Sequence, residues 1–331
     1  MFKLSICIPT YQRVEYLQHA LDSIVKQANS VVQPVQIVIS DNASSDGTID
    51  LISRYQTIYP NIKYHRWDEN VGPDRNFLKA VEIADGEYCW LFGDDDALET
   101  GGLNTVLKKL SKHNPTGVSV GVQYYESDLI RKRPKMRTVD HNVDVHFKES
   151  QEAFAELAPF FGYLTGQIVK RNYWMYVTYV YPVELYLNAY VHVYIIGQML
   201  IDHPDWYYIS KSIVSCRQGN DSFSKEGMFK RIEYDINGYT EITLSVFKNR
   251  KVYKKIMSKI LSVYTIGQIN IAKLTNTADI SFVIRVFRLL FPIYYKNTKF
   301  WFILVPFLLI PSFLTTTLRN TKKRLERVIQ H

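Results

Sequence analysis

Three consecutive aspartates, Asp94, Asp95 and Asp96, are the clearest candidates for chemistry in this chain of 331 residues. This acidic run directly follows residues 88–92, an apolar stretch typical of a strand buried on both faces. Carboxylates crowded at a strand end repel one another unless a cation or strong hydrogen bonds lie between them. Oxygen ligands suit a hard divalent ion such as Mg²⁺ or Mn²⁺, which commonly also binds phosphate oxygens. The acidic run therefore predicts a metal and phosphate site, with a solvated acidic turn as the alternative.

Polar residues also follow the first two predicted strands. After the first strand come Thr10, Tyr11 and Arg13, which offer a hydroxyl, an aromatic face and a guanidinium suited to bidentate phosphate contact. Asp41 ends the second strand, where its carboxylate can accept a hydrogen bond from the edge of a nucleobase or serve only in a turn. Together, these residue types predict a nucleotide pocket at one edge of the sheet.

Residues 70–76 add Arg75 near the start of a predicted helix, and helix N-termini favour phosphate. Several other phosphate and catalytic motifs are missing from the sequence. It has no GxGxxG after its first strand, no GxxxxGK[ST] and no GxSxG. These absences argue against a dinucleotide-dependent oxidoreductase, a P-loop NTPase and an α/β-hydrolase.

The first 125 residues alternate strand and helix patterns, which predicts an α/β fold with a mainly parallel sheet flanked by helices. The predicted strands are 4–8, 35–39, 61–67, 88–92 and 117–122, and the predicted helices are 14–28, one that opens at Ile49, 73–84 and 101–112. Ligands of such sheets bind beyond the carboxyl ends of the strands. Asp41 and the acidic run are expected there.

The chain changes character beyond residue 125. Residues 126–150, which include the charged segment 131–135, predict a surface loop. From residue 151 the pattern is helical apart from a strand at 206–209, and residues 226–272 predict two helices. We therefore expect three regions, which cover residues 1–125, 126–225 and 226–331.

Composition narrows the class of protein. Hydrophobic residues make up 47% of the chain and charged residues 22%, which excludes a disordered or collagen-like protein. The three cysteines, Cys7, Cys89 and Cys216, are far apart and odd in number, which argues against a disulfide framework and a CxxC zinc site. We expect a reduced, cytosolic protein without a signal peptide, because residues 1–10 lack a basic n-region.

The net charge of +8 is concentrated at the C-terminal end. Residues 280–331 hold one acidic residue, Glu326, and these basic residues: Arg285, Arg288, Lys296, Lys299, Arg319, Lys322, Lys323, Arg324 and Arg327. The other residues carry equal numbers of acidic and basic side chains. A nucleic-acid binder would more often spread its basic residues over a folded face, whereas here they flank an apolar stretch. The pattern indicates an anionic membrane surface and no nucleic acid.

The apolar stretch itself covers residues 301–318, which contain no charge. It is short for a bilayer, which needs about 20 apolar residues, and Pro306 and Pro311 interrupt a helix. We therefore expect an in-plane or re-entrant anchor, with residues 280–295 as an amphipathic partner, rather than a full span. The expected location is peripheral, on the cytoplasmic face of the cell membrane. The alternative is a buried helix pair that closes the core.

Four segments in order resemble the glycosyltransferases of family 2, which have the GT-A fold. They are residues 7–11, 40–48, 70–76 and 85–96. Within the family, the chain is similar to bacterial O-antigen transferases of the abequosyltransferase type, although the similarity is looser beyond about residue 125. The resemblance implies that the region 1–125 binds a nucleotide sugar, that the region 126–225 binds the acceptor and holds the catalytic base, and that the region 226–331 carries the anchor.

The resemblance also assigns site residues. A direct metal ligand is expected at Asp96, supported by Asp94, for Mn²⁺ or Mg²⁺. The residues expected to contact the donor are Pro9, Thr10, Tyr11, Arg13, Asp41, Asn70, Gly72, Arg75, Asp94, Asp95 and Arg217. Arg217 as an ordinary surface arginine is the alternative. Many relatives have a histidine where Gly219 stands, so the metal would rely on the acidic run, phosphates and water.

The inverting family uses a base, normally an aspartate on a helix of the second half, to deprotonate the acceptor hydroxyl. Counting back from the landmarks Tyr208 and Arg217 places His192 at that position. A neutral imidazole can accept a proton at cytosolic pH. The alternatives are a packed histidine, with the base at Glu184, Asp202 or Asp205.

Together these features predict an inverting glycosyltransferase. It would move a hexose or deoxyhexose from a nucleoside-diphosphate sugar to a hydroxyl of a polyprenyl-diphosphate-linked oligosaccharide, as in O-antigen or surface-polysaccharide synthesis. The alternatives are a nucleotidyltransferase that acts on a sugar phosphate and a catalytically inactive, membrane-bound scaffold.

Overall fold

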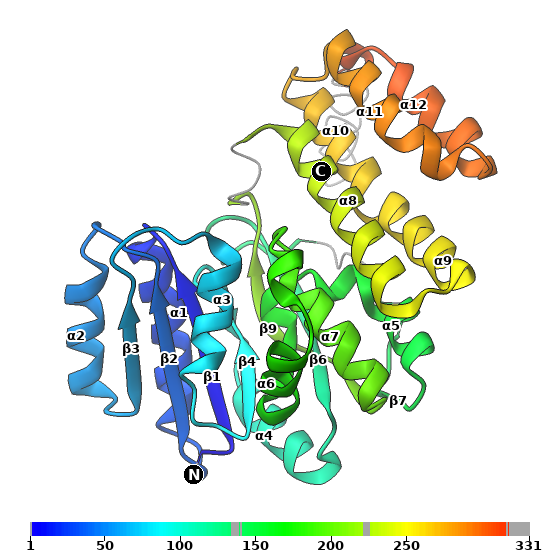
Figure 1. Ribbon diagram of the computed structural model, residues 1–331. Coiled ribbons are helices and arrows are strands. Elements are labelled where there is room, and N and C mark those ends of the chain that lie inside the picture. Colours follow the sequence, from blue (N-terminus) through cyan, green and yellow to red (C-terminus); the bar gives the residue numbers. More distant parts are fainter. Residues whose placement is uncertain (1, 134–138, 140, 221–225, 316, 318–331) are drawn as a thin grey trace, which may run out of the picture. The chain divides into compact units, whose positions relative to one another are not determined.

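The computed structural model describes residues 2–133, 139, 141–220, 226–315 and 317 (Figure 1). The chain forms two units. The first comprises Met1–Asn220 with Ile242–Val252, and the second comprises Asp221–Glu241 with Tyr253–His331. The boundary expected near residue 125 lies inside the first unit and stays a prediction.

The first unit is built on a nine-stranded sheet with the order β3-β2-β1-β4-β8-β6-β9-β5, and β7 pairs with β9. The strands are β1 (Leu4–Thr10), β2 (Val35–Asp41), β3 (Ile62–Arg66), β4 (Tyr88–Leu91), β5 (Ala97–Leu98), β6 (Gly117–Tyr125), β7 (Val145–Phe147), β8 (Gln167–Lys170) and β9 (Trp206–Arg217). Strands β1 to β4 are parallel to one another. Strand β8 is antiparallel to both β4 and β6, so β6 and its parallel neighbour β9 run in the same direction as β1 to β4. The mainly parallel sheet is confirmed.

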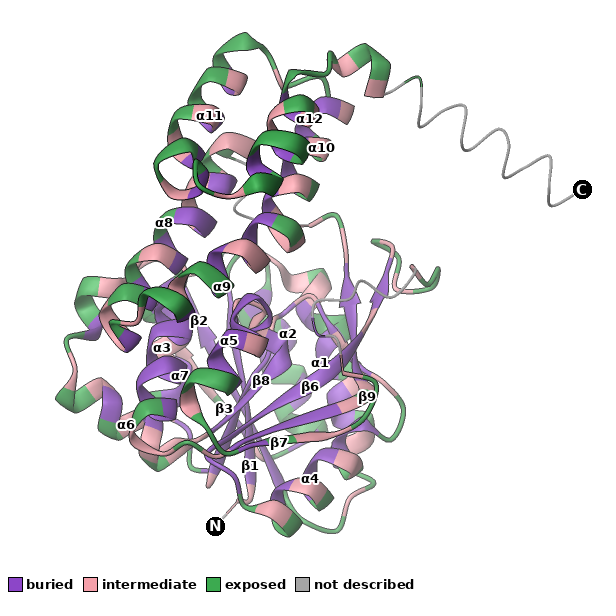
Figure 2. Ribbon diagram, turned by 90° about the vertical axis from the view of Figure 1, so that its right-hand side faces the viewer, coloured by how far each residue is buried: buried purple, intermediate pink, exposed green. Residues whose placement is uncertain are grey.

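Helices cover both faces of this sheet (Figure 2). Helices α1 (Val14–Ala28), α2 (Thr48–Ile58) and α4 (Gly102–His113) lie on one face, and α3 (Pro73–Glu82), α5 (Ser150–Phe161), α6 (Arg171–Val180) and α7 (Val191–Asp202) lie on the other. Every residue of β1 and β2 is buried, as is expected of strands covered on both sides. The alternation of strands and helices predicted this layered arrangement correctly.

The structure departs from the sequence-based prediction in the middle of the chain. Strand β8 was not predicted, because a run of only four residues between two helices has too little periodicity to identify. Within residues 126–150, expected to be a surface loop, β7 pairs with β9. The predicted strand at 206–209 continues to Arg217, with shifts of register opposite Gly121 that a local pattern does not reveal. Residues 134 and 135 of the charged segment lie outside the described residues.

The second unit is helical. It contains parts of α8 (Met228–Phe247) and α9 (Arg250–Ile260), followed by α10 (Ile266–Leu274), α11 (Ile280–Tyr294) and α12 (Val305–Leu309). One π-helical turn, Leu261–Thr265, joins α9 to α10, and another, Phe300–Leu304, precedes α12. The two helices expected in 226–272 are therefore present, the second with a π-helical insertion.

The interruption predicted at Pro311 is present, but the one predicted at Pro306 is wrong, because the backbone stays helical from the π-helical turn Phe300–Leu304 into α12. Helix α12 has Pro306 in its first turn and ends before Pro311. The ammonium of Lys273, which is buried, donates hydrogen bonds to the carbonyl oxygens of Leu308 and Ile310. A cation at this end of a helix is favourable because the last carbonyls lack helical partners. Across the portion of the chain that the structure describes, no helix combines the length and apolar character required to traverse a bilayer.

Candidate active site

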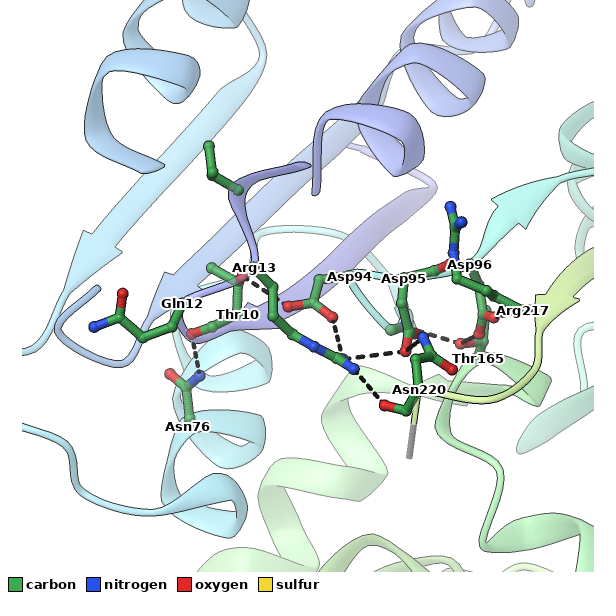
Figure 3. A network of polar contacts seen from close by, with 12 residues as sticks. Thr10, Gln12, Arg13, Asn76, Asp94, Asp95, Asp96, Thr165, Arg217 and Asn220 are labelled. Atoms are coloured by element: carbon green, nitrogen blue, oxygen red, sulfur yellow. Dashed lines mark hydrogen bonds and ion pairs between the residues drawn. The ribbon is translucent and has the colours of Figure 1, made fainter. Parts of the chain in front are cut away.

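The carboxyl ends of β1, β2 and β4 meet at one edge of the sheet, where the predicted site residues gather (Figure 3). Thr10 is paired with Asp41 in the register of β1 and β2. The acidic run follows β4, the other neighbour of β1. The far end of β9 arrives at the same edge, since the backbone N–H of Arg217 donates to Asp96 at 3.0 Å.

Arg13 holds two of the three carboxylates together. Its Nη1 donates to Asp94 at 2.9 Å and to Asp95 at 3.1 Å, while Nη2 donates to the carbonyl oxygen of Asn220 at 2.7 Å. The Thr10 hydroxyl also donates to Asp94, at 2.8 Å. The residues expected to meet phosphate therefore neutralise part of the acidic run in this structure.

Asp96 has its carboxylate fully occupied. One oxygen accepts hydrogen bonds from the hydroxyls of Tyr163 at 2.6 Å and Thr165 at 2.5 Å, and the other accepts the Arg217 N–H. Burial, together with the neighbouring charge of Asp95, raises the pKa of Asp96 well above its usual range. Asp96 thus ties β9 and the segment before β8 to the end of β4.

Asp95 is the most accessible member of the acidic run. Its side chain is 20% exposed, whereas that of Asp94 is 5% exposed and Asp96 is 3% exposed as a residue. Its partners are the charged Arg13 and the Asn220 amide, at 2.5 Å, both of which are side chains that rotate. These contacts favour Asp95 over Asp96 as a direct metal ligand, and the role expected of Asp96 stays a prediction.

The donor set fits a divalent cation that is completed by substrate. Among the described residues, no group of three or more His, Cys, Asp or Glu side chains is arranged to bind a metal ion. Mg²⁺ and similar ions are, however, commonly held by one or two carboxylates plus phosphate oxygens and water. Burial and the charge of Asp95 also raise the pKa of Asp94 despite the Arg13 contact, so Arg13 alone does not supply enough positive charge to stabilise both ionised carboxylates.

Arg217 is not the surface arginine of the alternative expectation, because it is 6% exposed. Its Nε donates to the backbone oxygen of Asp95 at 2.9 Å, its Nη1 donates to the carbonyl oxygen of Ser127, and its Nη2 lies 3.1 Å from Nδ1 of His19. Figure 3 shows the guanidinium pointing away from Arg13. Arg217 fixes the backbone of the acidic run, and a contact with the diphosphate stays a prediction.

Asp41 is fully buried at the end of β2. Its carboxylate accepts the Ser44 N–H at 2.9 Å and the Tyr64 hydroxyl at 2.8 Å, and Arg66 lies 3.7 Å away. In this structure Asp41 therefore closes the turn after β2, and its hydrogen bond to a nucleobase stays a prediction. Pro9 is buried within β1, whereas Tyr11 is 43% exposed beside this turn.

The structure adds Asn42, which sequence reasoning missed. Its side-chain oxygen accepts the Val71 N–H at 2.8 Å, and its amide nitrogen donates to Asn70 at 2.8 Å and to the carbonyl oxygen of Gly72 at 3.3 Å. Gly72 has a φ of +87°, a conformation that glycine adopts without strain. Asn42 therefore joins the predicted donor segments 40–48 and 70–76. In the sequence, the signal that could have identified Asn42 was its position directly after Asp41.

The other missed residues come from three separate parts of the chain. Tyr163 and Thr165, which hold Asp96, lie just before β8. Asn76 connects the ends of β1 and β2, because it accepts the Ser40 hydroxyl at 2.7 Å and donates to the Thr10 carbonyl at 3.3 Å. Asn220 contacts both Arg13 and Asp95.

The acidic candidates for the base lie at different edges of the sheet. Asp205 immediately precedes β9, and Asp202 ends α7, so both lie at the edge opposite the acidic run. Their positions disfavour both as bases. Glu184 accepts a hydrogen bond from Arg75 at 2.9 Å, with both side chains exposed. Arg75 follows β3 at the start of α3, so Glu184 lies at the edge that holds the site.

His192 lies in the first turn of α7 and is 2% exposed. Its ring packs edge-on against Phe77 of α3, with the centroids 6.0 Å apart. Neither ring nitrogen forms a well-aligned hydrogen bond with any described residue, although the backbone of Phe161 and Gly162 is close enough to act on its charge. Burial lowers the pKa of His192 to about 4, against a small opposing effect of that backbone. The imidazole is therefore neutral at cytosolic pH, and its role as the base stays a prediction.

Comparison with known proteins identifies the family. The model of glycosyl transferase family 2 matches residues 5–173, which include the acidic run, Arg13, Asp41 and the segment 70–76. The chain belongs to glycosyl transferase family 2. Over 270 residues it is 34% identical to abequosyltransferase RfbV of Salmonella typhimurium, which covers 78% of this chain and 79% of the relative. It is also 33% identical over 113 residues to a Campylobacter jejuni enzyme, GalNAc(5)-diNAcBac-PP-undecaprenol beta-1,3-glucosyltransferase, covering 34% of this chain and 36% of the relative.

Solved structures place the transferase in the GT-A fold. Staphylococcus aureus TarS 1–349 in complex with UDP is similar with a TM-score of 0.63 and 14% identity, over 95% of this chain and 88% of the neighbour. Mannosyltransferase PcManGT from Pyrobaculum calidifontis, in complex with GDP-Man and Mn²⁺, gives a TM-score of 0.54 with 14% identity, over 96% and 87% of the two chains. The predicted family, fold and enzyme class are confirmed, and they favour the predicted glycosyl transfer over the alternative of nucleotidyl transfer.

The contacts of Asp96 and Asp95 predict different effects of the same substitution. Asp96→Asn keeps one acceptor oxygen and places an amide N–H₂ group at the other position, against either the Arg217 N–H or the two hydroxyls, so we expect the free energy of unfolding to fall by about 2 kcal/mol. Asp95→Asn, at a partly exposed pair, is expected to change it by less than about 0.5 kcal/mol. Urea unfolding of the full chain, followed by near-ultraviolet circular dichroism, measures both. Equal losses would contradict the structural role given to Asp96.

Proposed function

We propose that the protein is an inverting transferase that uses a nucleoside-diphosphate hexose or deoxyhexose as donor and a lipid-linked oligosaccharide as acceptor. The observation that carries the proposal is the acidic run, joined to Arg13 and Thr10 at the carboxyl edge of a family-2 sheet. The relatives support the substrate class, because one is an abequosyltransferase and another acts on an undecaprenol-linked saccharide by its name.

The chain's own groups would perform the binding of the donor. We assign the nucleoside to the pocket edge formed by Tyr11, Asp41 and the segment 70–76, which Asn42 fixes. Arg13, freed from Asp94 and Asp95 when they bind a cation, would turn to the diphosphate, for which a guanidinium is suited. Asp95 would hold the divalent cation, with Asp94 and Asp96 behind it. The bound cation supplies a positive charge that stabilises the departing diphosphate.

The reaction then needs one proton acceptor. The base takes the proton of the acceptor hydroxyl, the oxygen attacks the anomeric carbon from the face opposite the diphosphate, and the bond from that carbon to the diphosphate oxygen breaks with inversion. We assign the base to His192, because its imidazole is neutral and lies close to the backbone of Phe161 and Gly162. These residues directly precede Tyr163, whose hydroxyl donates to Asp96. Glu184 is the second candidate, because it lies at the same edge and is exposed.

A nucleotide panel tests the donor. We expect one of UDP, CDP, dTDP or GDP, with Mn²⁺, to raise the midpoint of thermal unfolding by about 5 °C. Asp95→Asn should remove the portion of this shift that depends on Mn²⁺ because it removes the accessible carboxylate. Incubation with the matching sugar nucleotide and acceptor should release a nucleoside diphosphate. Release of pyrophosphate from a nucleoside triphosphate and a sugar phosphate, assayed separately, would instead indicate a nucleotidyltransferase, and binding without turnover would indicate an inactive scaffold.

Substitution of the two candidate bases tests the second assignment. His192→Gln should lower kcat about 10²-fold, the usual contribution of a general base, while the donor KM stays close to wild type. Because burial lowers the pKa of His192 to about 4, the imidazole stays unprotonated as the pH falls through 6, and wild-type kcat should hold down to about pH 5. Loss of activity in Glu184→Gln with near-normal His192→Gln would move the base to Glu184.

The second unit offers the surface for a lipid-linked acceptor. Helix α11 buries Phe282, Val286, Leu290 and Tyr294, while large apolar side chains on its other face and beyond it are exposed: Ile280, Ile284, Phe291, Tyr295, Trp301, Phe302, Ile303, Leu309, Phe313 and Leu314 (Figure 2). We call this set the apolar face. The basic residues Arg285, Arg288, Lys296 and Lys299 are exposed along the same segment. An apolar face bordered by cations fits an anionic membrane interface. We therefore propose a peripheral position on the cytoplasmic face of the cell membrane.

Vesicle binding tests the apolar face. Phe302→Ser with Phe313→Ser should weaken binding of the full chain to phosphatidylcholine vesicles that contain phosphatidylglycerol at least about tenfold, because two apolar side chains no longer enter the interface. The matched control is Val32→Ser with Ile58→Ser, which removes two exposed apolar side chains of the first unit. Omission of phosphatidylglycerol should also weaken binding, because the cations lose their counter-charge. Equal loss in the control pair would reject the proposal.

A further inference from the structure

The first turn of α7 is held by a carboxylate from another helix. Asp74, in the first turn of α3, accepts the backbone N–H of Ala189 at 2.8 Å and that of Val191 at 3.3 Å. Val191 is the first residue of α7, and no side chain of its own segment caps this helix. The first N–H groups of a helix lack helical partners, so Asp74 supplies the acceptor that a local cap would normally provide.

This carboxylate has no evident reason to be buried other than these two bonds. Asp74 is 6% exposed, and burial raises its pKa while the two N–H groups oppose that change. A buried carboxylate is costly unless it is hydrogen-bonded. The two N–H groups therefore take the place that water would occupy around an exposed carboxylate.

The segment that Asp74 holds is strained. Ala189 has a φ of +73°, a left-handed conformation that costs a residue with a Cβ atom free energy. Its N–H is the one that donates to Asp74 at 2.8 Å. Three residues later comes His192, whose ring packs against Phe77 in the same turn region of α3. On the side of α3, both of these contacts are therefore made by residues 74–77.

On its N-terminal side, Asp74 is connected to the segments 40–48 and 70–76, which are predicted to bind the donor. Residues 70–72, which Asn42 holds by its bonds to Asn70, Val71 and Gly72, directly precede Pro73 and Asp74. Asn42 in turn follows Asp41 at the end of β2. The polar contacts of Asn42 and those of Asp74, which are joined by the chain between Gly72 and Asp74, thus connect the predicted nucleobase pocket to the first turn of α7.

We infer that Asp74 is a positioning residue for catalysis: it holds Ala189 and Val191 so that the first turn of α7, with His192, keeps a fixed place relative to the donor segments. The inference rests on the proposed function, because it concerns the alignment of the base with the donor. A shift of about 1 Å between reacting groups can cost about 10²-fold in rate, so loss of this contact should act on kcat.

The test compares two carboxylates that accept backbone N–H groups, the buried Asp74 and the half-buried Asp144. Asp74→Asn faces two donors with only one acceptor, so kcat should fall about 30-fold with the donor KM within about twofold of wild type. The control is Asp144→Asn, because Asp144 accepts the Ser210 N–H at 3.0 Å in the first half of β9, away from the acidic run, and also pairs with Lys109. Both variants should lower the thermal midpoint, and Asp144→Asn should keep the wild-type kcat. Asp74→Glu, which keeps the charge, provides a second variant if Asp74→Asn does not fold.

A rescue variant tests the mechanism of positioning. Glycine adopts a φ of +73° without strain, so Ala189→Gly in the Asp74→Asn background should recover about fivefold of the lost kcat. The inference is overturned if folded Asp74→Asn keeps the wild-type kcat, if Asp144→Asn loses as much, or if Ala189→Gly recovers nothing. These outcomes are distinct from failure of the proposed function, in which the wild-type protein itself neither binds a nucleoside diphosphate nor transfers sugar.

Discussion

Negative charge crowded at the end of β4 is the constraint on which the site depends. The three carboxylates of the acidic run lie where a buried strand leaves the sheet, and burial raises the pKa of Asp94 and Asp96. Such charge persists only when donors and cations surround it. The chain meets this condition with groups from three distant segments, which contribute Thr10 and Arg13, then Thr165, then Arg217 and Asn220.

These neighbours divide the acidic run into different tasks. Asp96 receives neutral donors on both oxygens and thereby joins β4 to β9 and to the segment before β8. Asp95 faces the more open side and is paired with groups that can rotate away. The negative charge therefore serves the fold at Asp96 and stays accessible at Asp95, where we propose that it binds a cation. This division explains how three adjacent carboxylates are tolerated in a transferase whose leaving group is itself anionic.

The donor and acceptor sides of the site are connected by short polar side chains rather than by large hydrophobic contacts. Asn42 links the segments 40–48 and 70–76, and Asp74 continues this connection to α7. Hydrogen bonds are directional, so they fix loops at defined places where apolar packing alone would permit sliding. The strained φ of Ala189 is consistent with such a fixed place, because backbone strain persists only where surrounding contacts determine it.

The amino-acid sequence by itself determined the alternation of strands and helices, the edge at which Asp41 and the acidic run lie, and the break at Pro311. These follow from local periodicity and from residues whose backbone preferences are strong. Only the tertiary structure decided that Asp96 is enclosed while Asp95 is accessible, that Arg217 is buried, and that Asp202 and Asp205 lie at the far edge. Those properties depend on β8, on the shifted register of β9 and on contacts between residues more than a hundred positions apart, which no local pattern encodes.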